Sequence, residues 1–326
     1  MNKISRKNIS FYGLNRVCQV LRFLVFSALL VPNTPCQAQL LPLEKRLSGA
    51  LAVREVNDEY KECLKKADYL IGEYEFEKSN EYCKLMLKQE PEDFLAKAMM
   101  CLNYYEIAEQ LDVKNKKDKK EKREIYKEMI RVAEEGIKCA PDRGECYYMR
   151  GLANARISTT EGIFSSVFRA KGIERDWLEA VRHKSDYTSP RGENLENSAN
   201  LALGIYYRVC PTFFLLKLFF GISGDLDKSI EYCRKAYEED PYKGIEITKE
   251  LGISLISRGL KRNNGKDIEE GKEYLRKVKT LPLRLKTDSI DKEHSEILLN
   301  DISLCPGYSR DQQQDISEES FKKIIK

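Results

Sequence analysis

The chain contains 326 residues, of which 42% are hydrophobic and 33% are charged, a composition typical of a soluble helical protein large enough for one extended domain. Its formal charge is +4, but the first 38 residues hold five cations and no acid, so the remainder carries −1. A nearly neutral chain lacks the basic surface that binding to nucleic acid requires, and we expect no nucleic-acid partner.

Residues 1–38 are predicted to be a signal peptide. Met1–Arg22 carries the cations, Phe23–Val31 is an unbroken apolar run, and Cys36-Gln37-Ala38 approaches the pattern of a signal-peptidase site. We therefore expect cleavage before Gln39 and an exported protein, either periplasmic or secreted. A membrane anchor or a lipoprotein is the alternative. The apolar run is shorter than the roughly 20 residues that span a bilayer, so we expect no transmembrane span after removal of the signal.

A sequence repeat organises the rest of the chain, after an expected N-terminal linker at residues 39–58. Glu77–Pro91 reads EKSNEYCKLMLKQEP, and Asp227–Pro241 repeats it as DKSIEYCRKAYEEDP. The apolar positions of both copies recur at three- and four-residue steps, and each copy ends in a proline that cannot continue a helix. Each copy is therefore predicted to be the second helix of a helical hairpin.

Prolines divide the predicted repeat domain, residues 59–305, into five hairpins. They occur at positions 91, 141, 190, 241 and 282, at nearly even intervals. The three central hairpins have inserts between their helices: Val113–Lys122 is rich in lysine, whereas Ser158–Gly172 and Cys210–Gly224 are apolar. We expect the first insert to be a solvated loop and all three to project from one side of the array. Lys292–Ile302 is predicted to cap the array, before a polar C-terminal tail at 306–326.

The repeat resembles the tetratricopeptide-repeat family, in a degenerate form of an exported bacterial type. The residues that match the family's second helix are Ser79, Cys83, Met86 and Pro91, and in the later copy Ser229, Cys233, Ala236 and Pro241. Gly204 and Tyr207 match its first helix. This resemblance, which covers about Tyr60–Leu281, implies an all-α solenoid of αα-hairpins that binds a protein or peptide in its concave groove.

Adjacent tyrosines recur on the predicted first helices, which line the groove in this family. The residues that the family register turns toward the groove are Tyr105, Tyr147, Asn154, Leu201 and Arg208. Tyr104 and Tyr207, which belong to two of the tyrosine pairs, would then pack between helices. Tyrosine offers a large rigid ring and a hydroxyl, as binding surfaces favour. An equally good interpretation is that all of these tyrosines pack between helices.

The two apolar inserts need a place away from water, because burying a Phe or Leu side chain contributes roughly 1.5–3 kcal/mol. Their aromatic residues are Phe164, Phe168, Phe213, Phe214, Phe219 and Phe220. We expect the inserts to form short helices that pack on each other and on the array. They could instead line a ligand site or an oligomer or partner interface, or contact a membrane surface with Lys217 reaching toward the headgroups.

Eight cysteines follow the signal, but none forms a CxxC pair and the chain has only two histidines. We therefore expect no metal, haem or other cofactor. Cys83 and Cys233 stand at helix-packing positions and are expected to be buried thiols. Cys139 and Cys146 flank the turn at Pro141 and are a candidate disulfide.

No catalytic motif is present: the chain lacks G-x-S-x-G, H-E-x-x-H and G-x-G-x-x-G, and Gly259–Asp267 has the wrong spacing for a phosphate loop. We therefore predict a non-enzymatic scaffold or adaptor that binds a protein or peptide. The alternative is an accessory subunit that binds an apolar small molecule or lipid, similar to the T component of tripartite solute transport systems. Either could form a homo-oligomer.

Overall fold

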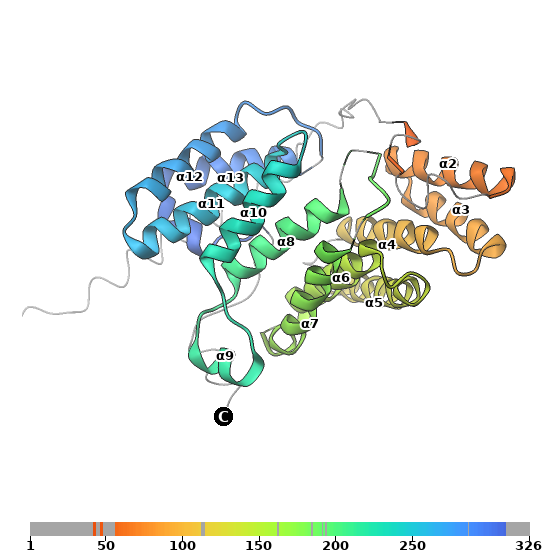
Figure 1. Cartoon of the computed structure of the whole chain (residues 1–326), viewed down its shortest axis with the longest axis horizontal. Coiled ribbons are helices and arrows are strands. Elements are labelled where there is room, and N and C mark those ends of the chain that lie inside the picture. The colour runs from red at the N-terminus through yellow and green to blue at the C-terminus, as the bar shows by residue number, and fades with distance from the viewer. Residues whose placement is uncertain are drawn as a thin grey trace, which may run out of the picture. The chain divides into compact units, whose positions relative to one another are not determined.

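The computed structural model describes residues 42–43, 46–47, 56–111, 115–161, 163–183, 185–190, 192, 194–285 and 287–310. These residues form helices joined by short connections, with no β-strand beyond isolated bridges (Figure 1). The predicted signal peptide, most of the linker and the tail from residue 311 lie outside the described residues.

The helices pair as hairpins. In chain order they are α2 (Asp58–Gly72), α3 (Phe76–Gln89), α4 (Phe94–Glu109), α5 (Lys116–Cys139), α6 (Gly144–Glu161), α7 (Ile163–Arg182), α8 (Leu195–Val209), α9 (Phe214–Phe220), α10 (Leu226–Glu239), α11 (Ile245–Arg262), α12 (Gly265–Val278), α13 (Asp288–Asn300) and the 3-10 helix η4 (Ile302–Gly307). The pairs are α2 with α3, α4 with α5, α6 with α7, α8 with α10, and α11 with α12. The predicted all-α repeat of helical hairpins is confirmed.

The first helices of successive hairpins also contact one another. α2 packs on α4, α4 on α6, α6 on α8, and α8 on α11. These helices form one layer, and their hairpin partners form a second layer. At the C-terminal end, α13 and η4 pack on α11, while α9 lies in the connection between α8 and α10 and packs on α7 (Figure 1).

Polar caps and prolines set the ends of the helices. The side chains of Asp93 and Asn194 accept backbone N–H groups in the first turns of α4 and α8. Pro91, Pro141 and Pro241 lie just past the ends of α3, α5 and α10. A proline at this place stops the helix, because its ring clashes with the preceding turn and it has no N–H to donate.

The lysine-rich insert is helical rather than a solvated loop, which corrects the prediction for it, whereas the two apolar inserts contain helices, as expected. The lysine-rich insert is helical from Lys116 onward, because lysine is a good helix former and Lys122 gains a partner on α4. Lys122 is buried, and its ammonium nitrogen lies 2.8 Å from a Glu109 carboxylate oxygen. The next insert continues α6 to Glu161 and starts α7 at Ile163. The last insert holds a separate helix, α9.

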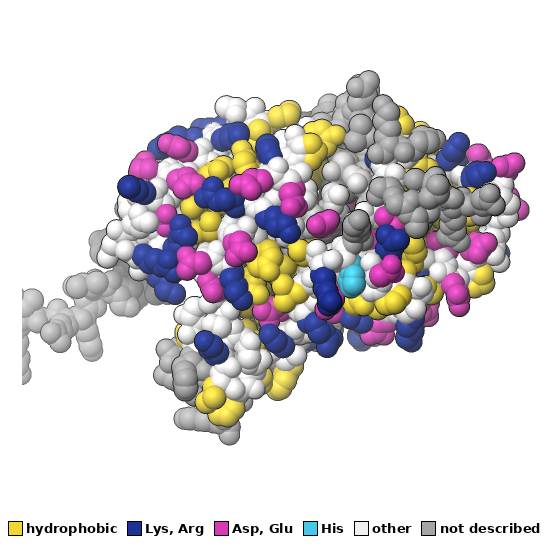
Figure 2. Space-filling model, viewed as in Figure 1, with side chains coloured by type: hydrophobic (Ala, Val, Ile, Leu, Met, Phe, Trp, Pro, Cys, Tyr) yellow, Lys and Arg dark blue, Asp and Glu magenta, His cyan; other side chains and the backbone are white. Residues whose placement is uncertain are grey.

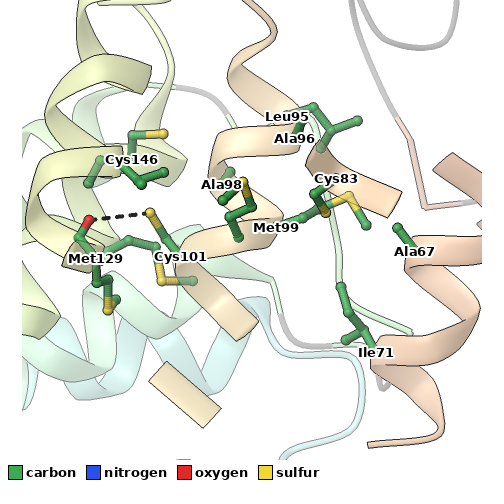
Figure 3. Close-up of a cluster of buried hydrophobic side chains, with 14 of the residues drawn as sticks. Ala67, Ile71, Cys83, Leu95, Ala96, Ala98, Met99, Cys101, Met129 and Cys146 are labelled. Atoms are coloured by element: carbon green, nitrogen blue, oxygen red, sulfur yellow. Dashed lines mark hydrogen bonds between the residues drawn. The ribbon is translucent and has the colours of Figure 1, made fainter. Parts of the chain in front are cut away.

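Sulfur-containing side chains fill much of the core between α3, α4, α5 and α6 (Figure 3). Cys83, Met99 and Met129 are fully buried, and the Cys101 thiol donates to the Met129 carbonyl oxygen at 3.5 Å. The predicted burial of Cys83 and Cys233 is confirmed. Burial raises the pKa of each of these two thiols to about 12. They therefore stay protonated and unreactive.

The folded part extends past the predicted domain limits at residues 59 and 305. Before α2, Arg46 donates to the Asp68 carboxylate and to the Thr188 carbonyl oxygen, each at 2.8 Å. After η4, the Tyr308 hydroxyl accepts a hydrogen bond from the Lys249 ammonium of α11 at 3.0 Å. Arg310 forms an ion pair with Asp291 of α13 at 2.9 Å. Among the described residues, none of the helices combines the length and apolar character that crossing a bilayer requires.

Candidate functional site

Two hollows lie along the first helices, and Ser198 of α8 lines both of them. The first hollow, of about 50 Å³, lies between α4, α6 and the start of α8, and its lining includes Tyr105, Tyr148, Leu152 and Tyr187. The second hollow, of about 100 Å³, lies between α8, the start of α11 and the connection before α13, and its lining includes Leu201, Tyr242, Ile247 and Leu285. Because they share Ser198, the two hollows adjoin.

Arg156 holds Tyr105, one of the tyrosines of the first hollow, in place. Its guanidinium donates a hydrogen bond to the Tyr105 hydroxyl at 2.8 Å and lies 5.6 Å from the Tyr105 ring centre. Glu109 lies 3.6 Å from the same guanidinium. Burial raises the pKa of Tyr105 to about 12, although Arg156 acts to lower it, so the phenol is neutral at physiological pH. The first hollow therefore presents a fixed, uncharged ring.

Turns hold the carboxylates of the second hollow. Asp240 accepts the Gly244 N–H at 2.6 Å, and Asp288 accepts the Arg284 N–H at 2.6 Å. Burial raises the pKa of Asp288. The Arg284 guanidinium lies 3.5 Å from the centre of the Tyr242 ring. The fold itself fixes these walls, which is the pre-organisation that lowers the cost of binding.

Two of the five predicted groove residues line the hollows: Tyr105 lines the first and Leu201 the second. Tyr147 and Asn154 line neither. Tyr147 stacks on His183 with ring centres 5.7 Å apart, and the Asn154 amide donates to a backbone oxygen of its own helix at 3.0 Å. The first helices therefore supply the hollows, but the family register selects only some of their lining.

The prediction that Arg208 faces the groove is wrong, because the segment after α13 covers it. The Arg208 side chain is fully buried, and its guanidinium lies 2.6 Å from the Glu250 carboxylate and donates to the Tyr308 carbonyl oxygen at 2.6 Å. A register taken from helical hairpins does not describe the segment that follows the last hairpin. Tyr207 is buried between helices, as predicted, and Tyr104 packs partly buried against the sulfur-rich core.

A charged core joins α8, α11 and α13 to the segment after η4. Its members are Arg208, Lys249, Glu250, Asp291, Tyr308 and Arg310. The fully buried ammonium of Lys249 lies 2.5 Å from Asp291 and 3.2 Å from Glu250. Burial acts to raise the pKa of Glu250, but Lys249 and Arg208 outweigh it and leave that pKa below its ordinary value. The sequence signal for this core is the Lys249-Glu250 pair, which directly precedes the largely apolar Leu251–Ile256.

The two apolar inserts contact each other, as expected. Phe168 of α7 meets Phe220 of α9 edge to face, with ring centres 5.6 Å apart, above the buried Val167 and Ile222. Phe213 packs against the same buried pair. The inserts therefore form a small core of their own beside the array.

This contact leaves part of the inserts in solvent. Phe168 and Phe219 are exposed, whereas Phe213 and Phe220 are partly buried. The side chains of Phe164 and Phe214 lie outside the described residues.

Cys139 and Cys146 do not form the predicted disulfide, and both are free thiols. The Cys146 side chain is buried against Gly136: a Cβ on that glycine would lie 2.3 Å from Cys146 Sγ. Cys146 would have to leave this packing to reach Cys139 at the end of α5. In the part of the chain that the structure describes, no group of three or more His, Cys, Asp or Glu side chains is placed to hold a metal ion.

These features define the class of the protein, an all-α repeat of helical hairpins with adjoining hollows on its first helices. Among solved structures it is similar to MamA from Desulfovibrio magneticus RS-1, with 17% identity over 74% of this chain and 99% of that chain and a TM-score of 0.40. A MamA RS-1 double mutant has 15% identity, covers 68% of this chain and 98% of its own, and gives a TM-score of 0.42. No family model and no curated protein matches the chain.

Proposed function

We propose that this chain is a non-enzymatic scaffold that binds a protein or peptide along the two hollows of its first helices. The observation that carries the proposal is that the hollows adjoin at Ser198, so one extended segment with two apolar side chains can fill both. Tyr105 and Tyr148 offer rigid rings in the first hollow, and Leu201 offers apolar surface in the second.

The sizes of the hollows favour peptide side chains over an apolar small molecule or lipid. The hollows measure about 50 and 100 Å³, whereas sites that enclose a drug-sized ligand have roughly 300–1,000 Å³. An accessory subunit similar to the T component of tripartite solute transport systems would need a larger cavity than either. A peptide only has to place single side chains in them.

We also propose that the protein is exported, either to the periplasm or out of the cell. The support is the basic start, the apolar run and the small-x-small ending of residues 1–38. The mass and N-terminal sequence of the protein recovered from expressing cells test this. A start at Gln39 is the expected result, and a protein that retains Met1 in the cytoplasm contradicts export.

Peptide selection followed by calorimetry tests the scaffold proposal. Peptides are selected on the full chain from a random library, and the dissociation constant of the best peptide is then measured for the chain and its variants. Ser198→Trp fills the junction of the hollows and Tyr105→Ala removes a ring, so each should weaken binding at least tenfold, about 1.4 kcal/mol.

The matched control is Glu77→Trp, which adds the same ring at an exposed position on α3. It should leave the dissociation constant unchanged, and circular dichroism should show that all three variants remain folded. A peptide whose affinity is insensitive to Ser198→Trp, or equally sensitive to Glu77→Trp, contradicts binding at the hollows.

A further inference from the structure

The most exposed large hydrophobic side chains of the described residues gather at one place. They are Phe168 at 70%, Leu218 at 61% and Phe219 at 60% exposure, from α7 and α9. We call these residues, with Lys217, the apolar tip. The next most exposed, Tyr69 at 52%, lies on α2 in another hairpin. Exposed apolar groups that cluster in this way mark an interaction site rather than chance exposure.

The apolar tip is held from beneath and left open outward. Below it, Val167 and Ile222 are buried, and Phe220 packs edge to face on Phe168. The principal helix packed on α9 is α7, and α9 stands away from the stacked hairpins in Figure 1. The exposed rings therefore lie on a projection that α7 supports. This projection can move from water into an apolar environment without disturbing the packing of the repeat.

Within the two segments that form the tip the charged side chains are basic, and the nearest acids in the sequence, Glu161, Glu174 and Asp225, stand at the borders of these segments. Residues 162–173 and 209–224, which form and flank the tip, contain Arg169, Lys171 and Lys217 and no acidic residue. Lys217 is exposed at the centre of α9, while Lys171 also pairs with Glu174. Yellow apolar and dark blue basic side chains mark this projection in Figure 2. A surface of aromatic rings, leucine and cations matches the interface of an anionic bilayer.

We infer that the apolar tip docks on the surface of an anionic lipid bilayer. A helix of seven residues is about 10 Å long, so α9 can enter the interface but cannot cross the roughly 30 Å hydrocarbon core. Phe168, Leu218 and Phe219 enter the apolar layer, and Lys217 extends its ammonium to the phosphates. A protein partner is less suited, because protein interfaces carry about one hydrogen bond per 100–200 Å² and α9 offers only Lys217 as a polar side chain.

A tryptophan placed at the tip tests this inference directly. The full chain has a single tryptophan, Trp177, which is buried, so Phe219→Trp adds a reporter against a constant background. With phosphatidylcholine vesicles that contain phosphatidylglycerol, its emission should shift to shorter wavelength and be quenched by brominated lipid. Neutral vesicles should give much smaller changes. The matched control is Tyr69→Trp on α2, which should give neither change with either vesicle.

Two surface variants measure the contribution of each part. Leu218→Ser together with Phe219→Ser should lower the affinity for anionic vesicles at least tenfold, and Lys217→Glu at least fivefold. Leu85→Ser, which removes an exposed leucine on α3, should have no effect. The inference is overturned if the Phe219→Trp emission is unchanged by vesicles, if neutral vesicles change it equally, or if it shifts without vesicles as protein concentration rises, which would indicate self-association.

Discussion

Sulfur-containing side chains pack the core around α3 to α6, whereas charged side chains are buried where α8, α11 and α13 meet the C-terminal segment. In the first region Met99 and Met129 fill space with flexible, polarisable chains that adapt to the helices around them (Figure 3). In the second, Lys249 and Asp291 meet in one geometry, with further contacts from Glu250 of α11 and from Arg310 of the C-terminal segment.

The first kind of packing suits the continuation of a repeat, and the second suits its end. Contacts between methionine and cysteine have little direction, so they join one hairpin to the next without fixing a single arrangement. Buried ion pairs are directional and lose much stability when one partner is absent. The charged core therefore specifies where Tyr308 and Arg310 lie, and so defines how the array closes.

The largest effect should come from Asp291→Ala. This change removes the partner of Lys249 at 2.5 Å and of Arg310 at 2.9 Å, leaving a fully buried ammonium with less compensation. Breaking a buried pair on one side costs about 4 kcal/mol of the free energy of unfolding. Urea unfolding followed by circular dichroism measures the loss.

The double variant Lys249→Met with Asp291→Leu is the control for this prediction. It removes both charges and replaces Lys249 by a side chain of similar volume, and such apolar replacements are often neutral or stabilising. We expect it to recover most of the lost free energy, with Glu250 still paired to Arg208 at 2.6 Å. A single variant that costs less than about 1 kcal/mol would show that these charges behave like a solvated surface pair.

Met99→Ala should have the next largest effect, and it tests the sulfur-rich core. Met99 is fully buried, so truncation removes apolar contacts and leaves a cavity, at a cost of about 3 kcal/mol. Met99→Leu keeps the volume and should cost less than about 1.5 kcal/mol. Leu85→Ala, at a partly exposed position on α3, should stay within about 0.5 kcal/mol. Equal losses of the free energy of unfolding in the three variants would contradict the interpretation that the methionine core adapts to a side chain of similar volume.

Where local chemistry decides, the sequence was sufficient to predict the fold. α8 spans Leu195–Val209 because Asn194 caps its start and Pro211 follows its end, and both signals can be read from the sequence. The prediction failed at the lysine-rich insert, since a run of charges indicates solvent only when no partner lies within reach. Glu109 is such a partner for Lys122: it lies on the preceding helix, α4, but close to Lys122 in space.

The candidate site was predictable only in part, for a similar reason. A family register gives the direction of a side chain on its own helix, and of the residues that it selects Tyr105 and Leu201 line the hollows. The register cannot predict which of these side chains are covered by later segments of the chain. Arg208 is buried by the segment that contains Tyr308, one hundred residues further on. The Cys139 and Cys146 prediction failed because proximity across a turn does not set side-chain direction.

A smaller effect should follow Gly204→Ala, because both regions place a glycine against a cysteine. A Cβ on Gly204 would lie 2.3 Å from Cys233 Sγ, as one on Gly136 would from Cys146 Sγ. Overpacking at this contact should cost about 2 kcal/mol. In the double variant with Cys233→Ala the clash with sulfur disappears, so we expect a favourable coupling of about 1 kcal/mol in a double-mutant cycle.

Residual strain in that double variant is also expected. The new methyl group would still lie 3.1 Å from the Cys233 backbone nitrogen and from the Ser229 carbonyl oxygen. The double variant should therefore recover only part of the free energy of unfolding that Gly204→Ala loses. Additive costs of Gly204→Ala and Cys233→Ala, measured by urea unfolding, would contradict a direct contact between the two side chains.

The smallest effect should be a difference in pH dependence between two buried carboxylates. Burial acts to raise the pKa of Glu250, but Lys249 and Arg208 hold it below the ordinary value of 4.5. Glu250 therefore contributes stability that is present above pH 4.5 and is lost as the pH falls through its folded-state pKa. Burial instead raises the pKa of Glu145 above 4.5, so that residue costs stability at neutral pH and the cost disappears as the pH falls toward 4.5.

Glu250→Gln and Glu145→Gln separate these two contributions. The free energy of unfolding of the unmodified chain minus that of each variant is measured by urea unfolding from pH 7 down to pH values below 4.5. For Glu250 the difference should decrease with acidification, because the ion pairs with Lys249 and Arg208 are lost. For Glu145 it should increase between neutral pH and 4.5, because the protonated carboxyl is the form that burial favours. Parallel pH profiles for the two variants would mean that Lys249 and Arg208 do not outweigh the burial of Glu250, and that the charged core is held by packing alone.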